Sequence, residues 1–513
     1  MRLTHRLLTA ASAVTIAMSG TMLSAATAGE KPKPSGWRHN QLQEYAADTW
    51  RSMAAMADPA TGLVSDNVGG DLSPASRAAY TSPTNIGAYM WSAIAAREIG
   101  LISAAETQAR IAQTLSTLAE MEIHEPSGMY YNWYNPSTGE KLTAWPIDGS
   151  VVHPFLSSVD NAWLATALEV VKDQVPALAD EADVVLERMD FGYYYNPAEN
   201  QIRGGFWVEP VPGSVPGNYR GGETVYYTGH HYGAFNTEPR MASYLGIASE
   251  QIPQRHYFGT WRTFPSTNCD WAWTEQKAVG EYREYLGVQV FEGAYEYRGM
   301  HMVPTWGGSM FEALMVPLFV PEETWGPQSW AINHPTYVQA QIEHGMEEAD
   351  YGYWGFSPSN DPAGGYREYG VDQIGMNPDG YSSDQERTTV DEGYGECRPA
   401  QPLPTSYGQG VVTPHASFLA LRYAPTEAMK NLRNLRKDFD AYGPGGFYDA
   451  INVSTGEMSE RYLSLDQGMI MAALGNQLAD DVMRSAFMDG DMAARVAPLM
   501  RMEEFVGVTQ GGG

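Results

Sequence analysis

The sequence has little positive charge and almost no cysteine. Lys and Arg together number 32 against 61 Asp and Glu, so the formal net charge is −29 over 513 residues. This balance argues against nucleic acid or an anionic membrane surface as a ligand and favours a neutral or cationic one. The alternative is that the acidity serves only solubility in salty surroundings.

Motifs for metal or nucleophilic chemistry are also missing. The chain has no HExxH or CxxC metal motif and no G-x-S-x-G elbow, and the GPGG run at 443–446 lacks the ending of a phosphate loop. His230 and His231 form a doublet without further ligands nearby in sequence. We therefore expect no metal and no cofactor. The exception to test is the acidic run TTVDEGYGE at 388–396, whose carboxylates are of the kind that bind calcium.

Residues 1–28 have the pattern of a secretory signal peptide. A positive start, an apolar stretch and a cleavage site follow one another: Arg2, His5 and Arg6, then residues 7–25, then Ala26-Thr27-Ala28. We expect secretion with cleavage near Ala28 and a mature chain of residues 29–513, in which no stretch approaches a membrane-spanning length. An exported chain can form a disulfide, and the sequence leaves open whether Cys269 and Cys397 pair.

Aromatic residues are plentiful and lie in unusual places. They make up 12% of the chain, with 31 Tyr and 14 Trp. Many fall in Gly-rich stretches without helical periodicity, such as MYYNWYNP, GYYYNP, YYTGHHYGAF and DYGYWGFSPS. Rings crowded into loops indicate a lined groove, in which their flat faces stack on sugar rings; the alternative is an aromatic-rich core.

Caps and 3.6-residue periodicity predict about twelve helices. They lie near 39–57, 84–99, 103–121, 159–175, 178–190, 238–251, 309–320, 334–349, 412–423, 425–439, 465–480 and 491–505. Six of them begin with a small or polar residue and are apolar on almost every side, which is typical of helices buried all round, and the others are amphipathic. Two concentric rings, an all-α (α/α)6 barrel, satisfy both patterns.

The alternation of buried and amphipathic helices fails once. The segment 254–305 lies where an outer helix is expected, and its pattern predicts strands and loops inserted into the barrel. An α-solenoid is the competing architecture, but no short period repeats in residue identity. Since there is no Pro- or Ser-rich linker either, we expect one domain.

Four carboxylates stand at the starts of the apolar helices: Asp160, Glu238, Glu312 and Asp466. Hydrolysis of a glycosidic bond needs two carboxyl groups, one to protonate the leaving oxygen and one to activate water or attack carbon. A helix start favours the ionised form, whereas burial among aromatics raises the pKa and suits the acid. A capping role is the alternative for each, above all for Asp160 and Asp466.

The stretch 291–318 gives Glu312 a particular setting. Aromatic and polar residues alternate first, the run Trp306-Gly307-Gly308-Ser309 breaks that pattern, and an apolar helix follows. Ser309 is placed to cap this helix, which puts Glu312 in its first turn. The two glycines permit a ligand to approach the backbone closely.

Eight segments occur in one order along the chain: TSPTNIGAYMWSAIAARE, SSVDNAWLATAL, NTEPRM, TWGGSMFEALMVPLFV, YGYWGFSPS, REYGVDQIGM, VVTPHASFLAL and GGFYDAIN. Together they resemble the glycoamylase-like domain of bacterial endo-β-1,2-glucanases and of cyclic β-1,2-glucan synthases. The resemblance covers about Thr81 to Asn452, and it implies an (α/α)6 barrel that acts on glycans without a metal. It also implies that the catalytic carboxylates are Glu238 and Glu312. One departure lies at Trp354–Ser359, where WGFSPS replaces the family's WGISES, so a subsite acid is lost and the linkage specificity is in doubt.

We expect Glu312 to be the base or nucleophile, because its helix start favours ionisation, and Glu238 to be the acid. The candidates for holding sugars are Asp160, Tyr232, Arg298, Trp306, Tyr353, Trp354 and Tyr366. Arg240 and Arg298 are open to a second interpretation, as ion-pair partners that orient the acids.

The sequence thus predicts a secreted glycoside hydrolase that cleaves a β-glucan, with β-1,2-glucan as the model substrate, and that inverts the anomeric configuration. The partner is an oligo- or polysaccharide, with no nucleic acid and no membrane. The alternatives are a non-catalytic glycan-binding protein, a retaining transglycosylase and a polysaccharide lyase. The lyase is disfavoured because lyases act on uronates and need basic subsites. The linkage, endo or exo action and the oligomeric state stay open.

Overall fold

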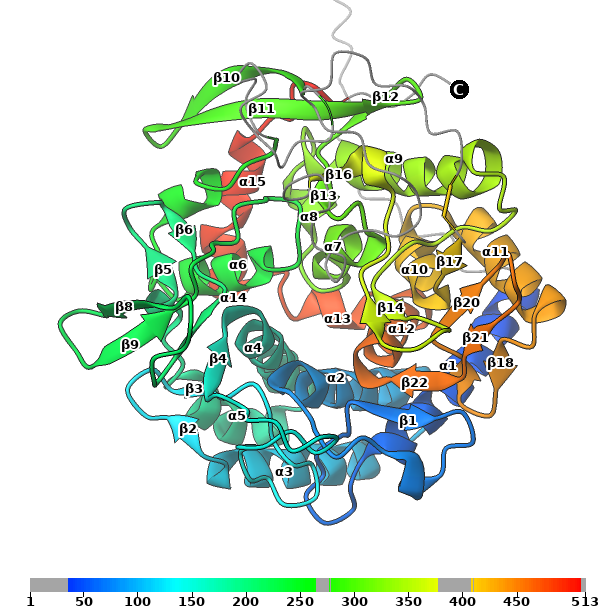
Figure 1. Cartoon of the computed structure of the whole chain (residues 1–513), viewed down its shortest axis with the longest axis horizontal. Helices are drawn as coiled ribbons and strands as arrows, with labels where there is room; N and C mark the ends of the chain where they lie inside the picture. Colours follow the sequence, from blue (N-terminus) through cyan, green and yellow to red (C-terminus); the bar gives the residue numbers. More distant parts are fainter. Residues whose placement is uncertain (1–35, 264–275, 277, 377–406, 409, 509–513) are drawn as a thin grey trace, which may run out of the picture.

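A computed structural model describes residues 36–263, 276, 278–376, 407–408 and 410–508 (Figure 1). The expected signal peptide, Cys269, Cys397 and the acidic run 388–396 lie outside these residues. In the described part of the chain, no helix has the length and apolar character needed to cross a membrane.

Six helices surround the centre of the molecule (Figure 1). They are α2 (Pro83–Ile99), α4 (Ser158–Gln174), α6 (Arg240–Ala248), α7 (Met310–Leu314), α10 (Pro414–Leu419) and α12 (Ser464–Leu478). Helix α12 packs on α2, α2 on α4, and α4 on α6, while α10 packs on both α12 and α7. The Arg240 side chain links α6 to α7, because it donates hydrogen bonds to the carbonyls of Glu312 and Ala313. These contacts close a ring.

Each inner helix has an outer neighbour. The pairs are α1 (Gly36–Met56) on α12, α3 (Ala104–Glu120) on α2, α5 (Ala179–Leu186) on α4, α14 (Gly490–Arg495) on α6, α9 (Trp330–Glu343) on α7 and α11 (Pro425–Asp438) on α10. The short helices α8 (Glu322–Trp325), α13 (Val482–Ser485) and α15 (Ala497–Met502) complete the outer layer.

The sequence of α2 explains its central position. The Ser82 hydroxyl accepts a hydrogen bond from the Asn85 N–H at 3.3 Å and so caps the helix. Residues 83–96 are all buried, which agrees with a helix that has no polar side. Gly87 lets α4 approach closely, since a Cβ at this position would lie 2.8 Å from the Trp163 carbonyl oxygen.

Large aromatic side chains fill the ring below the helix starts. Trp91 meets Trp163 edge to face at 6.2 Å, and Phe319 packs on both at 5.0 and 5.8 Å. The Trp91 Nε1 donates to the Gly468 carbonyl at 2.9 Å and ties α2 to α12 across 377 residues of sequence. The centre of the ring is therefore apolar below the helix starts.

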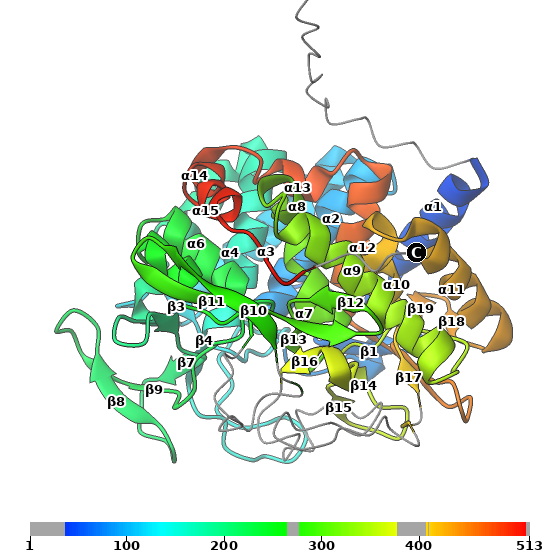
Figure 2. The same cartoon turned by 90° about the horizontal axis from the view of Figure 1, so that it is seen from above.

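Short strands lie between the helices. Two-stranded pairs join β1 (Asn67–Gly69) to β22 (Arg461–Leu463), β2 (Ile123–His124) to β3 (Met129–Tyr130), β5 (Tyr195–Asn196) to β6 (Gln201–Ile202), β13 (Thr305–Trp306) to β16 (Gly375–Met376), β14 (Ser359–Asn360) to β15 (Tyr366–Arg367) and β18 (Tyr442–Gly443) to β19 (Gly446–Phe447). A four-stranded sheet has the order β4 (Phe155–Ser157), β7 (Gly205–Trp207), β9 (Thr224–Tyr227), β8 (Val215–Asn218), and a three-stranded one the order β17 (Val411–Val412), β20 (Ala450–Asn452), β21 (Met458–Ser459). Most of these strands and the connecting loops lie on one face of the molecule and the helices on the other (Figure 2).

The expected insertion at 254–305 is a β-structure in its second half. Strands β10 (Val279–Tyr285), β11 (Val288–Tyr297) and β12 (Met300–Met302) form an antiparallel meander at the edge of the molecule (Figure 1). The expectation of an all-α fold is therefore wrong in part, because the mainly helical chain carries strands throughout.

Proline changes two of the expected helices. The range 309–320 divides into α7 and a 3-10 turn at Val316–Leu318 that contains Pro317, and the range 491–505 divides into α14 and α15, with Pro498 near the start of the second. Proline lacks an N–H and its ring clashes with the preceding turn, so it ends a helix or begins a new one. The remaining helices lie close to the expected ranges.

Candidate active site

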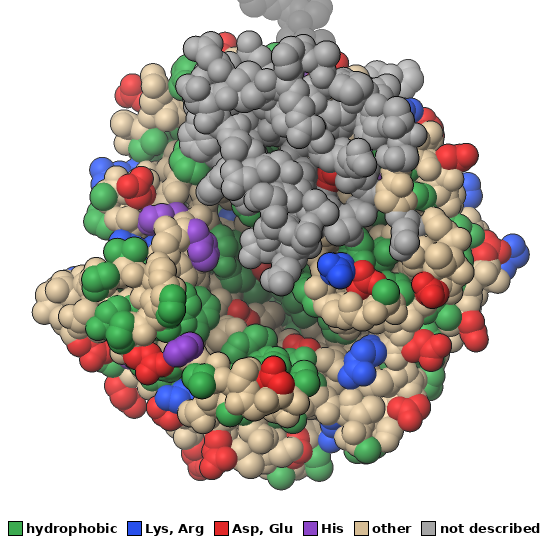
Figure 3. Space-filling view, in the orientation of Figure 1, with side chains coloured by type: hydrophobic (Ala, Val, Ile, Leu, Met, Phe, Trp, Pro, Cys, Tyr) green, Lys and Arg blue, Asp and Glu red, His purple; other side chains and the backbone are tan. Residues whose placement is uncertain are grey.

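The inner helices start on the face of the strands and loops, and a hollow opens there at the centre of the ring (Figure 3). Acidic and hydrophobic side chains are visible inside the hollow. Asp160, Glu312 and Asp466 lie in the first turns of α4, α7 and α12, and Glu238 lies two residues before α6. The fold thus gathers at one end the four carboxylates that the sequence places at helix starts.

Glu238 and Glu312 are in direct contact. The Glu312 Oε2 accepts a hydrogen bond from the backbone N–H of Glu238 at 2.7 Å, and the Glu238 Oε2 accepts one from the Trp163 Nε1 at 2.7 Å. Ser309 caps α7 as predicted, because its hydroxyl accepts from the Glu312 N–H at 3.2 Å. Glu312 is 9% exposed, so only a small part of this carboxyl group meets solvent.

Burial makes both carboxyl groups hard to ionise, though not equally. It raises the pKa of Glu238 well above its usual range, and the charge of Glu312 raises that pKa further. Burial also raises the pKa of Glu312, to about 7, although the Glu238 N–H, the Arg240 charge and Thr237 lower it. The sequence argument from the helix start alone was therefore wrong for Glu312, because burial outweighs it. The hydrogen bond from the Glu238 N–H and the Arg240 charge nevertheless favour the ionised form of Glu312.

Arg240 fixes the helix starts that carry this pair. Its Nη1 donates to the carbonyls of Thr237 at 2.7 Å and Glu312 at 2.9 Å, and its Nη2 donates to Ala313 at 2.8 Å. Its Nε and Nη2 also form a bidentate pair with Glu322 at 2.8 and 2.9 Å. All five N–H groups are thus used, and Arg240 has none left for a substrate.

Glu322 holds the Arg240 side chain in place through this bidentate pair. Its carboxylate also accepts from the Tyr244 hydroxyl at 2.9 Å and lies 3.0 Å from the His334 Nε2. Although burial opposes ionisation, the Arg240 charge and hydrogen bonds lower the pKa of Glu322 to about 2. This buried ion pair stays charged throughout the pH range in which the carboxylate pair titrates.

A second pair of carboxyl groups, Asp449 and Asp466, lies in the same hollow. Burial and the neighbouring Asp466 raise the pKa of Asp449 well above its usual range, and burial raises the pKa of Asp466 to about 7. Asp449 Oδ2 accepts from the Asn360 N–H at 2.6 Å, and Asp466 Oδ2 lies 3.3 Å from His415 Nδ1. Asp449 was missed in the sequence because it follows β19 rather than starting a helix. Its position in the GGFYDAIN segment was the available signal.

Tyr366 of β15 joins the two pairs. The residue is 52% exposed, and burial of its hydroxyl and then the charges of Asp466, Asp449 and Glu238 raise its pKa well above the usual range. Tyr366 thus presents an accessible face and a hydroxyl within the electrostatic reach of both carboxyl pairs.

Asp160 borders the pair on the other side. Its Oδ1 accepts from the Thr84 hydroxyl at 2.7 Å, and the Asn132 amide, oriented with its nitrogen toward Asp160, donates to Oδ2 at 2.9 Å. The charge of Asp160 contributes to the raised pKa of Glu238, which places the two side chains near each other. Asp160 therefore does more than begin a helix, although Ser157 is the residue that caps α4.

The glycines before Glu312 have a structural cause. A Cβ at Gly308 would lie 1.9 Å from the Val371 carbonyl oxygen, and one at Gly307 would lie 2.5 Å from Glu368 Oε1. Both residues have positive φ, 63° at Gly307 and 67° at Gly308. Packing against Val371 and room for Glu368 thus require them, and a close ligand is not needed to explain them. Trp306, half-buried in β13, lies directly before this turn.

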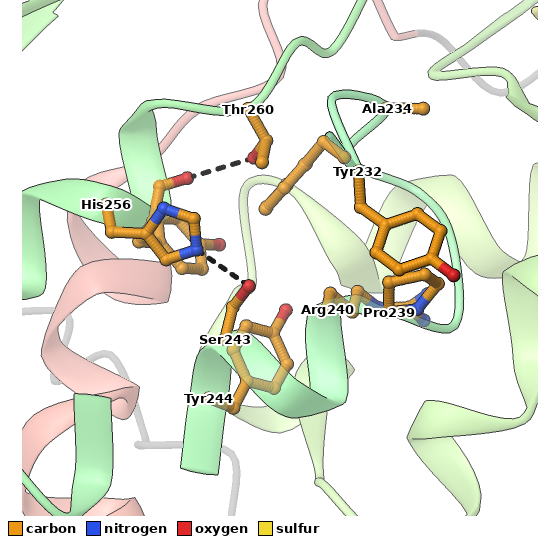
Figure 4. Close-up of a pocket in the computed structure, with 10 residues that line it drawn as sticks. Tyr232, Ala234, Pro239, Arg240, Ser243, Tyr244, His256 and Thr260 are labelled. Carbon is orange, nitrogen blue, oxygen red and sulfur yellow. Dashed lines mark hydrogen bonds between the residues drawn. The ribbon is translucent and has the colours of Figure 1, made fainter. Parts of the chain in front are cut away.

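A small pocket lies beside α6, next to the carboxylate pair (Figure 4). Tyr232 and Pro239 line it together with Arg240, Ser243 and His256. The His256 Nε2 pairs with the Ser243 hydroxyl at 2.8 Å, and burial lowers the pKa of His256 to about 4. The two polar side chains His256 and Ser243 are thus bound to each other, and Tyr232 lines the pocket.

Comparison with known proteins agrees with this arrangement. A family model described as "Putative glucoamylase" matches residues 236–490, which include Glu238, Glu312, Asp449 and Asp466. Residues 236–490 thus match a glycoamylase-like domain. A second family model, for a protein of unknown function, matches residues 44–205, which include α2 and α4 of the same ring.

Solved structures share the fold of this chain. An endo-β-1,2-glucanase from Chitinophaga pinensis, in complex with sophorotriose and glucose, has a TM-score of 0.61 at 16% identity and covers 90% of this chain and 98% of its own. A mutant endo-β-1,2-glucanase from Talaromyces funiculosus, in complex with β-1,2-glucan, has a TM-score of 0.62 at 12% identity and covers 93% of each chain. At these identities the likeness establishes the helical fold.

A curated relative, the cyclic beta-(1,2)-glucan synthase NdvB of Rhizobium meliloti (strain 1021), is 23% identical over 354 residues. The match covers 67% of this chain and 10% of the synthase, so the glycoamylase-like chain spans about a tenth of that relative.

Three of the expected sugar-binding residues have other contacts. Arg298 pairs with Glu343 at 2.9 Å and Glu347 at 2.8 Å on the outside of the glycoamylase-like fold. Trp354 is 2% exposed and its backbone is bound to Asn431, so its ring belongs to the core.

Tyr353 is the third of these residues. Its hydroxyl donates to Asp438 at 3.0 Å and its ring meets Phe439 at 5.1 Å, so it packs on the end of α11. In these cases the local aromatic composition resembles that of a groove, but the rings fill the space between elements. Among the described residues, no group of three or more His, Cys, Asp or Glu is arranged to hold a metal ion.

Proposed function

We propose that the protein is a secreted glycoside hydrolase that cleaves a β-glucan, with β-1,2-glucan as the expected substrate. The observation that carries the proposal is the buried pair Glu238 and Glu312, whose raised and unequal pKa values suit an acid and a base. Endo-β-1,2-glucanases with the same fold, and a synthase of a β-1,2-glucan, support the choice of glycan.

We further propose that residues 29–513 form one (α/α)6 barrel and that residues 1–28 are removed on export. The six inner helices, each with an outer neighbour, support the barrel. Inner helices from both matched segments, α2 and α12, pack on each other, which supports one domain instead of two.

In the proposed reaction Glu238 is the acid. Its protonated carboxyl group gives a proton to the leaving glycosidic oxygen, and the Trp163 Nε1 holds one of its oxygens in place. Glu312 is the base, and it takes a proton from a water molecule whose oxygen attacks the anomeric carbon. The released proton equivalents balance, since one carboxyl group loses a proton and the other gains one.

Two rivals do not fit the hollow as well. A lyase acts on uronates, and a hollow lined by Asp160, Glu238, Glu312, Asp449 and Asp466 repels such anions, while Arg240 is fully engaged by Glu322 and backbone carbonyls. Burial opposes the ionisation of both carboxyl groups, which is unfavourable for the folded protein. A protein that only binds glycans has no use for such a pair.

The decisive experiment incubates the purified protein with linear β-1,2-, β-1,3- and β-1,4-glucans and resolves the products by chromatography. We expect oligosaccharides from β-1,2-glucan, and turnover lowered by about 10²–10⁴-fold in Glu238→Gln and Glu312→Gln. Glu187→Gln, at an exposed position at the end of α5, is the control and should match the wild type.

If either Gln variant kept near wild-type turnover, the residue replaced in it would have no part in the chemistry. If Glu312→Gln stayed active while Asp449→Asn lost activity, the Asp449–Asp466 pair would take the role of the base. Retention of oligosaccharide without any cleavage would instead favour the binding protein.

The stereochemical outcome distinguishes an inverting hydrolase from a retaining transglycosylase. The transglycosylase is an alternative because the chain is similar to a glucan synthase. Inversion requires carboxyl groups about 6.5–9.5 Å apart with a water between them, and retention about 5–5.5 Å. We propose inversion, so the first product seen by NMR should carry the α configuration. A β product would make Glu312 a nucleophile.

A further inference from the structure

Three aromatic rings form a cluster that the proposed reaction does not use. Tyr80 and Trp145 lie 4.6 Å apart at an interplanar angle of 37°, and Trp133 meets them edge on at 5.6 Å (82°) and 5.3 Å (78°). All three side chains are half-buried, so part of each ring is accessible. We call these residues the aromatic triad.

The triad stands at the edge of the hollow. Tyr80 comes three residues before α2. The next residue, Thr81, forms a β-bridge with Tyr134, which follows Trp133. Trp145 lies in a loop in which the Trp145 carbonyl accepts from the Gly149 N–H at 2.9 Å. The triad is thus built on the segments that lead into the inner helices, on the same face as the carboxylate pair.

Polar groups connect the triad with the catalytic pair. Asn132, the neighbour of Trp133, donates to Asp160, and the charge of Asp160 acts on Glu238. On the other side, the Asn67 amide bridges the Tyr80 hydroxyl at 3.4 Å and Asp66 Oδ2 at 2.8 Å. The triad therefore lies between two carboxylates, Asp66 and Asp160.

We propose that the aromatic triad is an outer sugar subsite, in which Trp145 stacks on a neutral pyranose ring and Asp66 and Asp160 accept hydrogen bonds from its hydroxyl groups. The inference rests on the proposed function for the kind of glycan. Tyr80 and Trp133 hold the indole in place, since they pack on it, and the loop leaves it accessible. The acidic neighbours exclude an anionic sugar and match a neutral one, whose hydroxyl groups are donors.

Two neighbours of Trp145 support an open position for this loop. Ile147 is 76% exposed and Val151 is 71% exposed. Together with Trp145 they give this loop an accessible apolar surface, which a flat sugar face can cover.

The test measures binding, so that it does not depend on turnover. Linear β-1,2-glucooligosaccharides of increasing length are titrated calorimetrically into the Glu238→Gln protein with and without Trp145→Leu. We expect Trp145→Leu to weaken the longer chains by about three- to tenfold and to leave the shortest chain that binds unchanged. Trp145→Tyr keeps a flat ring and should restore affinity to within about twofold.

Two controls separate stacking from packing. Tyr282→Ala removes an aromatic ring that is 56% exposed on the β10–β11 hairpin, an element that carries no residue of the triad, and should not change the affinity. Melting temperatures of all variants are compared, because a mere packing role for Trp145 would lower stability and leave affinity unchanged.

Equal affinity of Trp145→Leu and Trp145→Tyr for long chains would overturn the subsite, as would an equal loss for every chain length. The proposed hydrolysis is judged separately, by the turnover of the wild type. Length-dependent binding without any turnover would leave the subsite standing and refute the hydrolase, and turnover with unchanged binding in Trp145→Leu would do the reverse.

Discussion

Arg240 shows how one side chain sets the geometry of a reaction in which it takes no proton. Its bonds to Thr237, Glu312 and Ala313 fix the two backbone segments that carry the carboxylate pair. Its charge also lowers the pKa of Glu312. Position and charge are separable, because lysine keeps the charge and loses the planar fork, whereas methionine loses both.

We therefore expect Arg240→Lys and Arg240→Met both to lower kcat by about 10–100-fold, since small misplacements of catalytic groups are costly. Only Arg240→Met should shift the rising limb of the kcat–pH profile to higher pH, because Glu312 must lose its proton without the help of a nearby cation.

Arg422→Lys is the matched control, because Arg422 pairs with Glu323 and Asp481 at the far end of α10. It should lower the melting temperature without moving the pH profile. Identical pH profiles for Arg240→Lys and Arg240→Met would refute the electrostatic part of this role.

Among the elements, the β10–β11 hairpin carries an uncommon buried acid. Glu292 on β11 is 1% exposed, and burial and then the charge of Glu503 raise its pKa to about 8, although Arg262, Tyr285 and Arg283 lower it. A carboxyl group with a raised pKa keeps a proton in the folded state that the unfolded chain gives up above about pH 4.5. Its contribution to stability is thus complete below that pH and is lost as the pH rises toward 8.

We expect the wild type to lose stability between pH 5 and pH 8.5, seen as a fall in melting temperature. In Glu292→Gln this loss of unfolding free energy should be smaller by an amount on the order of a few kcal/mol. The slope will not vanish, because Asp449, Asp466, Glu238 and Glu312 have raised pKa values as well.

Glu281→Gln is the control. Glu281 lies opposite Glu292 in the hairpin register but is exposed, so its removal should leave the slope unchanged. Parallel curves for Glu292→Gln and the wild type would mean that Glu292 is ionised in the folded protein.

Helix positions could be predicted well where the signal is local. The range 84–99 corresponds to α2 at Pro83–Ile99, because Ser82 caps it and its residues are apolar on every side. The prediction failed at 309–320, where Pro317 ends the regular helix although the apolar pattern continues.

The site residues could likewise be predicted only where the sequence signal is local. Glu238 and Glu312 stand at helix starts and were chosen from four such carboxylates by the family resemblance, and the structure brings them into contact. Asp449 was missed because it follows β19 and does not start a helix, although it lies beside Asp466 in the fold. Trp354 was chosen for a groove although it lies in the core, since composition does not distinguish the two positions, and Arg298 pairs with Glu343 and Glu347.

At the scale of the whole molecule, the proposed chemistry moves protons between carboxyl groups and needs no metal. The described part of the chain offers no cluster of ligands for one. We therefore expect dialysis against EDTA to leave turnover within about twofold of a sample dialysed without EDTA. A loss that Ca²⁺ restores would point to the acidic run 388–396 and would overturn this prediction.

The bond between Trp91 and the Gly468 carbonyl has a consequence for the order in which the chain matures. Because α12 is the last inner helix and covers α2, the first one, synthesis must reach residue 478 before the ring can close. Without α12 the apolar side of α2 is uncovered, so a chain that ends before residue 478 should expose apolar surface and aggregate instead of forming a smaller enzyme.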